Sequence, residues 1–169
     1  MVRVRQGIAA YRATGAALNV PYFGTLQAEV SAHLGHTADG LQALAEAHTL
    51  VEQHEERWWE AEIYRLRGVL LLRQTRPQQE EAETWLQRSL EVARRQEAKS
   101  LELRTAMSLA RLWQQQGKYD DTCALLAPIY GWFTEGFDTA DLQAARALLD
   151  ELTWGRIRSE SPSWRLYQD

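Results

Sequence analysis

The sequence predicts an all-α fold, an α-solenoid built from repeated pairs of antiparallel helices. Ala, Leu, Glu, Gln and Arg dominate the composition, proline occurs only four times, and no segment alternates as a strand does. A helical pattern with a small residue at its centre recurs at positions 28, 68 and 110, with spacings of 40 and 42 residues. Such periods are typical of repeat arrays, in which each unit buries its apolar face against its neighbours.

Glycine and proline mark the limits of the first two helices. Residues 2–14 carry apolar side chains at helical intervals, and Gly15 ends this segment. Pro21 suits the first turn of the next helix, because its missing N–H would have no partner there. That second helix is expected to end at Gly35.

Three further helices are expected in the middle of the chain. Thr37 and the residues after it open one of them. The next runs from about residue 57 to 74, and Pro77 marks the break after it. A helix over about 79–96 follows that break.

The last three helices have clear polar or glycine boundaries. Ser100 is expected to cap a helix that ends near Gly117. The next starts at about Tyr119 and contains Pro128, so we expect it to be kinked or interrupted there. A final helix over 138–152 begins with cap-forming residues.

Composition and charge exclude several classes of protein. The chain has 169 residues, of which 45% are hydrophobic and 25% charged, as in an ordinary globular domain with a substantial core. The net charge is −4 and no basic block stands out, which argues against nucleic-acid binding. No apolar run approaches the length of a membrane span, and the first residues lack the apolar core of a signal peptide. Since the single cysteine, Cys123, cannot form an internal disulfide, we expect a cytoplasmic protein.

The helix pairs resemble tetratricopeptide (TPR) repeats. The family's small-x3-large-x2-small run on the second helix of a pair appears here as Gly40, Leu44 and Ala47, then Ala82, Leu86 and Ser89, then Thr122, Leu126 and Ile129. The resemblance covers about residues 2–134 and implies a right-handed solenoid. The family's aromatic positions are mostly replaced, and the period exceeds the usual length of about 34 residues, so the repeats resemble a longer-helix variety.

The repeat register divides the chain. Counting back 40 residues from Leu44 and Ala47 leads to Val4 and Gly7, so the first helix matches the second half of a repeat. We therefore expect a fragment from the C-terminal end of a longer array. The expected organisation is a repeat domain over 1–152 and a tail over 153–169. The repeat domain comprises a half repeat at 2–14, repeats at about 20–54, 57–96 and 100–134, and a capping helix at 138–152.

The tail carries turn-forming residues without a clean period, so disorder is its default expectation. Its end is amphipathic, because Trp164, Leu166 and Tyr167 lie close together in the sequence. Such an end could dock on an apolar groove of the same chain or of a neighbour.

A second resemblance covers the third repeat and the segment after it. Residues 98–104, 109–113 and 130–142 are similar to the C-terminal repeat region of large bacterial signalling proteins, in which a nucleotide-cyclase-like or DNA-binding domain precedes a signal-transduction ATPase. This similarity implies a sensing or regulatory role. It brings no catalytic residues, and the chain has no Gly-x4-Gly-Lys-[Ser/Thr] phosphate-binding loop.

Other candidate chemistry is weak, so we expect no enzyme activity, no metal and no cofactor. Four histidines, at positions 33, 36, 48 and 54, lack a carboxylate or cysteine at zinc-like spacing. Cys123 has no obvious histidine partner and is interpreted as a packing residue.

The TPR resemblance implies a concave groove lined by the first helix of each pair. The groove residues expected from this resemblance are Tyr22, Thr25, Glu29, His33, Glu62, Arg65, Val69, Arg73, Arg104, Met107, Arg111 and Gln115. Four of them are arginines, which pair bidentately with carboxylates, so an acidic peptide or a C-terminal carboxylate is the natural ligand. An equally weighted alternative is that these arginines form solvated ion pairs with Glu29, Glu62 and Glu102. If the groove binds acidic peptides, reversing the charge of Arg65 and Arg111 should abolish binding without unfolding the protein.

Two functions of different classes follow. The preferred one is a non-catalytic protein- or peptide-binding module, the sensing part of a larger bacterial signal-transduction protein. The alternative is a structural element that assembles a homo-oligomer through its end faces, including Ile8 and Tyr11, and through its tail. Neither function involves nucleic acid or a membrane.

Overall fold

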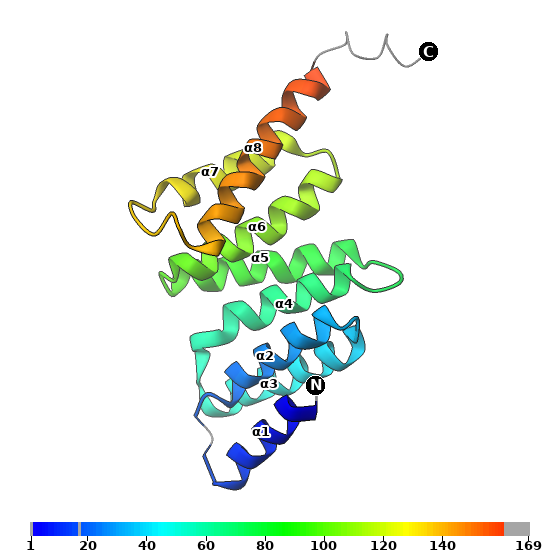
Figure 1. The fold of residues 1–169 in the computed structure, drawn as a ribbon, viewed down its shortest axis with the longest axis vertical. Helices are drawn as coiled ribbons and strands as arrows, with labels where there is room; N and C mark the ends of the chain where they lie inside the picture. The colour runs from blue at the N-terminus through cyan, green and yellow to red at the C-terminus, as the bar shows by residue number, and fades with distance from the viewer. Residues whose placement is uncertain (1, 17, 161–169) are drawn as a thin grey trace. The chain divides into compact units, whose positions relative to one another are not determined.

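The computed structural model describes residues 2–16 and 18–160, and this part of the chain is all-α without a strand (Figure 1). The helices are α1 (Val2–Ala13), α2 (Val20–His33), α3 (Thr37–His54), the 3-10 turn η1 (Arg57–Trp59), α4 (Glu60–Leu72), α5 (Gln79–Arg95), α6 (Lys99–Gln115), α7 (Tyr119–Gly131) and α8 (Ala140–Glu160). The all-α prediction is confirmed for these residues.

The chain divides into two compact units, residues 1–97 and 98–169. The boundary falls between the expected repeats at 57–96 and 100–134. In unit 1, each helix from α1 to α5 packs on the next one along the chain, and α2 also contacts α4 (Figure 1). In unit 2, α6 packs on α7, α7 packs on α8, and α8 also contacts α6.

Three successive helices build the core of unit 1. The buried cluster comprises Ala28 from α2, Leu44, Ala47 and Val51 from α3, and Ile63, Leu66 and Leu70 from α4. Each of these residues is at most 3% exposed. Burial of a large aliphatic side chain stabilises a fold by roughly 1.5–3 kcal/mol, so this cluster is a main source of the unit's stability.

Small residues let these helices approach closely. A Cβ atom added at Gly24 would lie 2.7 Å from Cβ of Ala47, so α2 rests directly on α3. A Cβ atom added at Gly68 would lie 2.8 Å from Cγ of Leu86, so α4 rests directly on α5. At this separation any larger residue would push the two backbones apart.

The C-terminal helix is longer than predicted. Residues 153–160 belong to α8, so the expected helix end at 152 and the default of disorder for this stretch were wrong. Beyond the buried Leu152, a Cβ atom at Gly155 would lie 2.6 Å from Cε1 of Tyr119. The absence of a side chain at this position lets α8 continue across the tyrosine ring. The tail residues Trp164, Leu166 and Tyr167 lie outside the described residues.

Two helix boundaries differ from the predictions. Ser100 is not the N-cap of α6, because the helix already begins at Lys99 and Ala98 precedes it without a side-chain cap hydrogen bond. Pro128 does not interrupt α7, which continues to Gly131, so the predicted interruption is absent and a kink at the proline stays a prediction.

Candidate binding groove

The centre of the expected groove in unit 1 is a buried ion pair. The Arg65 guanidinium donates from Nε to Oε2 of Glu62 at 2.8 Å and from Nη2 to Oε1 at 2.6 Å. Glu29 on α2 adds a weaker contact at 3.7 Å. Arg65 is 9% exposed and Glu62 is 3% exposed, so the pair lies inside the fold rather than on a solvated face. Both charges stabilise the packing of α4, and Arg65 presents little surface to a partner.

The remaining expected groove residues of unit 1 differ in accessibility. Thr25 is buried and donates its hydroxyl hydrogen bond to the Tyr22 carbonyl at 2.7 Å, so its side chain is closed to a ligand. Tyr22 is half-buried and stacks on Trp59, with ring centroids 4.5 Å apart. Val69 is half-buried, whereas His33 and Arg73 are exposed at the ends of their helices.

The expected groove residues of unit 2 lie along α6. Met107 is 4% exposed and belongs to the core of that unit. Arg104 is half-buried, and its Nε lies 3.8 Å from Oδ2 of Asp141 on α8. Arg111 and Gln115 are exposed. Since Arg65 and Arg73 belong to unit 1 and the other two arginines to unit 2, convergence of all four stays a prediction.

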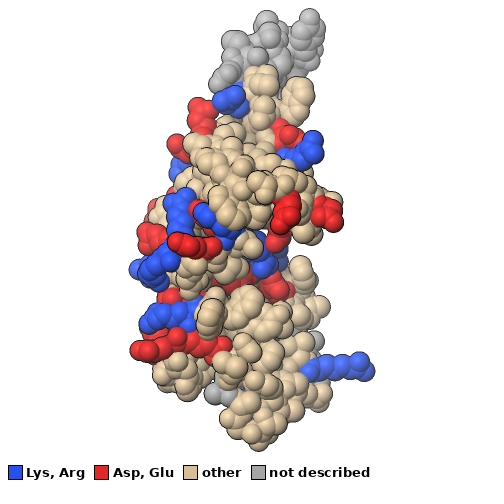
Figure 2. Space-filling view, turned by 90° about the vertical axis from the view of Figure 1, so that its left-hand side faces the viewer, with Lys and Arg blue, Asp and Glu red and all other residues tan. Residues whose placement is uncertain are grey.

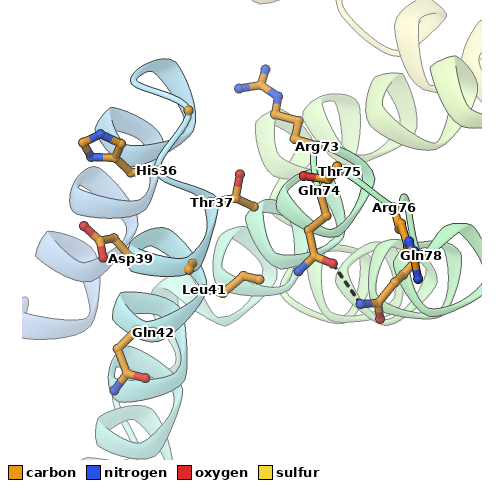
Figure 3. Close-up of a pocket in the computed structure, with 12 residues that line it drawn as sticks. His36, Thr37, Asp39, Leu41, Gln42, Arg73, Gln74, Thr75, Arg76 and Gln78 are labelled. Carbon is orange, nitrogen blue, oxygen red and sulfur yellow. Dashed lines mark hydrogen bonds between the residues drawn. The ribbon is translucent and has the colours of Figure 1, made fainter.

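Residues that the repeat register missed form an open groove in unit 1. Its walls are the α2–α3 turn with the first turn of α3 and the loop after α4 (Figure 3). The groove encloses about 1190 Å³. It is lined by Gly35, His36, Thr37, Ala38, Asp39, Leu41, Gln42, Arg73, Gln74, Thr75, Arg76 and Gln78. Arg73 is the member of the expected set that borders this groove.

Local sequence determines both walls of this groove. Gly35 adopts φ +74°, and the N–H of His36 donates to the Ser31 carbonyl at 2.9 Å, which ends α2 in a tight turn. On the other wall, the side-chain amide of Gln78 donates to Oε1 of Gln74 at 2.8 Å across the loop (Figure 3). Pro77 follows Arg76 in this loop and restricts its backbone.

The groove presents two accessible cations. Arg73 and Arg76 are exposed, and neither forms an ion pair with another described residue. Asp39 lies on the opposite wall and is the one carboxylate among the groove residues. A groove with two exposed guanidinium groups and several side-chain amides can bind a carboxylate-rich ligand through charge-assisted hydrogen bonds.

A separate polar network joins α3, η1 and α4. The Tyr64 hydroxyl lies 2.9 Å from Nε2 of His48 and donates to Oε1 of Glu60 at 3.1 Å. Burial is the largest cause that raises the pKa of Tyr64, and the Glu60 carboxylate is the next. Together they raise this pKa to about 12. Arg57 also donates to Glu60, at 3.2 Å. Because the Glu60 carboxylate is occupied by these partners, we interpret the network as structural.

Next to this network, two guanidinium groups lie against one indole ring. The Arg67 guanidinium carbon lies 4.0 Å from the Trp85 ring centroid and that of Arg88 lies at 4.9 Å. Trp85 also donates from Nε1 to Oε1 of Glu81 at 3.2 Å. Charged side chains of both signs intermingle at the height of α4 and α5 in Figure 2. These arginines are engaged by neighbours, unlike those of the groove.

Other kinds of site are absent from the described part of the chain. No three His, Cys, Asp or Glu side chains among the described residues gather as metal ligands would. No described helix is both long and apolar enough to cross a membrane. Every buried side-chain nitrogen and oxygen among the side chains that the structure describes has a hydrogen-bond partner. Cys123 is a half-buried free thiol on α7.

Comparison with protein-family models, with curated proteins and with solved structures found no match to this chain.

Proposed function

We propose that the chain is a non-catalytic protein- or peptide-binding module whose partner is acidic. One observation carries the proposal: Arg73 and Arg76, both exposed and without an ion-pair partner among the described residues, border the same open groove. Charged groups left unpaired at the edge of a concave surface favour a ligand of opposite charge. The chain's net charge of −4 makes such a local basic site stand out.

Two further features support a repeat module. The small residues Ala28 and Gly68, which are 40 positions apart, are both buried where one helix of a pair contacts the next. The successive contacts from α1 to α5 are those of a stacked array. We therefore retain, as part of the proposal, a right-handed TPR-like solenoid of antiparallel pairs that acts in the cytoplasm as the sensing region of a larger bacterial signalling protein.

The groove proposed here lies further along α4 than the sequence predicts. Arg65 is removed from the ligand-binding set, because it is buried against Glu62. Arg73, two helical turns later, takes its place together with Arg76 from the loop. We expect the ligand to lie between the α2–α3 turn and the loop that follows α4.

Charge reversal tests this assignment. We expect Arg73→Glu with Arg76→Glu to weaken binding of a fluorescein-labelled Glu-rich octapeptide at least about tenfold, measured by fluorescence anisotropy. Asp39→Asn should strengthen binding, because it removes a repelling charge from the opposite wall. Arg146→Glu is the matched control, since Arg146 is an exposed arginine on α8 outside the groove. Equal affinities for all four proteins would remove the groove as the binding site.

A further inference from the structure

A second groove, separate from the one above, lies between α1 and α2. It encloses about 270 Å³ and its surface is mainly apolar. Val4, Gly7 and Tyr11 of α1 form one side, and Phe23 and Leu26 of α2 form the other. Tyr11 fixes the two helices together, because its ring meets the Phe23 ring edge-on at 5.0 Å and its hydroxyl donates to the Leu18 carbonyl at 2.8 Å. The groove is thus a built feature of the fold.

The residues of this groove correspond, 40 positions earlier in the sequence, to residues of the unit 1 core. Five of its six apolar or small lining residues have a counterpart 40 positions later in the buried cluster, and the sixth, Ile8, corresponds to His48 outside it. The pairs are Val4 and Leu44, Gly7 and Ala47, Tyr11 and Val51, Phe23 and Ile63, and Leu26 and Leu66. The counterparts in the core are at most 3% exposed to solvent. In the groove, by contrast, Leu26 is 36% exposed and Gly7 is exposed.

The groove differs from the core in that one covering helix is absent from it. In the core, α2 covers the surface formed by α3 and α4, with Ala28 in the cluster and Gly24 directly against Ala47. At the equivalent Gly7, a Cβ atom would meet nothing within 4 Å. The end of unit 1 that carries α1 in Figure 1 shows mostly uncharged side chains in Figure 2. The α1–α2 surface therefore has two of the three helices that make this core elsewhere in the same chain.

Charge selects the occupant. The α1 sequence contains three arginines and no carboxylate, and Arg3 lines the groove. A second copy that offered its own α1 would bring like charges together, which is unfavourable. A helix with carboxylates on its outer face would instead be attracted to this surface.

We propose that the α1–α2 groove docks an amphipathic helix of a partner protein, acidic on its outer face and with a glycine or alanine at its centre. The small central residue takes the place that Ala28 holds in the equivalent core, where a larger side chain would hold the helices apart. The mode of binding is that of a helix laid into an apolar groove.

The probe comes from the chain's own second helix, α2. A labelled synthetic peptide of residues 20–34 carries Gly24 and Ala28 on the face that covers the equivalent core. Leu26→Glu and His33→Glu in the peptide add charge at two exposed positions and, with Glu29, make it acidic. A basic version carries Leu26→Lys, Glu29→Lys and His33→Lys, and a bulky version of the acidic peptide adds Ala28→Leu.

Binding of these peptides to the full chain is measured by fluorescence anisotropy, with two variants at Gly7. Gly7→Leu fills the open space, and Gly7→Ala is the matched control. Both variants should fold as the parent does, which circular dichroism checks, because nothing stands within 4 Å of the added Cβ atom and glycine is the weaker helix former. We expect Gly7→Leu to bind the acidic peptide at least about tenfold more weakly than Gly7→Ala does.

We also expect the unmodified chain to bind the basic and bulky peptides at least about tenfold more weakly than the acidic one. Failure of the chain to bind the acidic peptide, or equal affinities of the two Gly7 variants, would overturn the proposal. A dimer in light scattering that Gly7→Leu abolishes would also overturn it, because the occupant would then be a second copy.

Discussion

At the residue scale, the Arg65–Glu62 pair illustrates how burial changes the role of a charge. Because Glu62 is 3% exposed, removal of Arg65 takes away the cation that pairs with its carboxylate inside the protein. We predict that Arg65→Met lowers the free energy of unfolding by about 3–5 kcal/mol, and that charge reversal at this position is at least as damaging. Arg65→Met with Glu62→Leu should recover much of the loss, since the carboxylate that also contacts Arg65, that of Glu29, is 37% exposed rather than buried. Urea denaturation of the unmodified chain, of Arg65→Met and of the double variant measures these free energies of unfolding. An unchanged midpoint for Arg65→Met would contradict the account.

The Tyr64 hydroxyl predicts a dependence of stability on pH. Its pKa is raised from 10.0 to about 12, so between these values the unfolded chain loses the phenolic proton while the folded chain keeps it. Stability contributed by Tyr64 is therefore complete below pH 10 and is lost as the pH rises toward 12. The Glu60 and Glu52 carboxylates add to the rise in the pKa of Tyr64, the Arg88 guanidinium opposes it, and His48 lies within hydrogen-bond distance of the hydroxyl.

The control for this prediction is Tyr64→Phe, which removes the titrating group. We expect the free energy of unfolding to fall less steeply between pH 10 and 12 for Tyr64→Phe than for the unmodified chain. Urea titrations at half-unit pH intervals measure the two slopes, and equal slopes would show that Tyr64 does not stabilise the folded state in this way.

Residue roles in the groove were only partly predictable from the sequence. Helical spacing identified the face of α4 that carries Arg65 and Arg73, but not the depth of each side chain. Glu62, three positions before Arg65, was a signal of local pairing, since residues at this spacing face each other on a helix. Arg76 lies in a loop outside the repeat register, so no periodic argument could have placed it beside Arg73.

At the element scale, close helix contacts depend on glycine at particular positions. A Cβ atom at Gly68 would lie 2.8 Å from the Leu86 side chain and 3.0 Å from the Ala82 carbonyl oxygen. We predict that Gly68→Ala destabilises the chain by about 1–3 kcal/mol despite the better helix propensity of alanine. Gly7→Ala is the control and should stabilise by up to about 1 kcal/mol, because its surroundings are open. Thermal unfolding compares them, and equal shifts would refute the close contact at Gly68.

Helix existence followed from the sequence better than helix ends did. Apolar spacing and the proline and glycine breaks located all eight expected helices close to their observed ranges. The end of α8 was missed because Gly155 reads as a helix breaker in sequence, whereas in the fold its missing side chain accommodates the Tyr119 ring. Tertiary contact decided this boundary, and local propensity could not.

At the scale of the whole molecule, the account assigns two surfaces of unit 1 to partners of similar charge. The groove beside Arg73 and Arg76 is of mixed polarity, whereas the groove between α1 and α2 is mainly apolar with a basic edge. Binding at exposed arginines should weaken steeply with added salt, since such charges are screened over about 10 Å at 0.1 M ionic strength. Docking on the apolar groove should persist at salt concentrations that release the octapeptide, because apolar burial does not depend on screening.

A charge-swap titration tests the central claim most directly. The unmodified chain and the variant with Arg73→Glu and Arg76→Glu are each titrated with a Glu-rich octapeptide and with its Lys-rich counterpart. The account predicts that the unmodified chain prefers the acidic peptide and that the variant prefers the basic one, because the charges at positions 73 and 76 set the sign of the ligand that this groove binds. If the variant bound the acidic peptide as tightly as the unmodified chain does, recognition through the arginines of this groove would be contradicted.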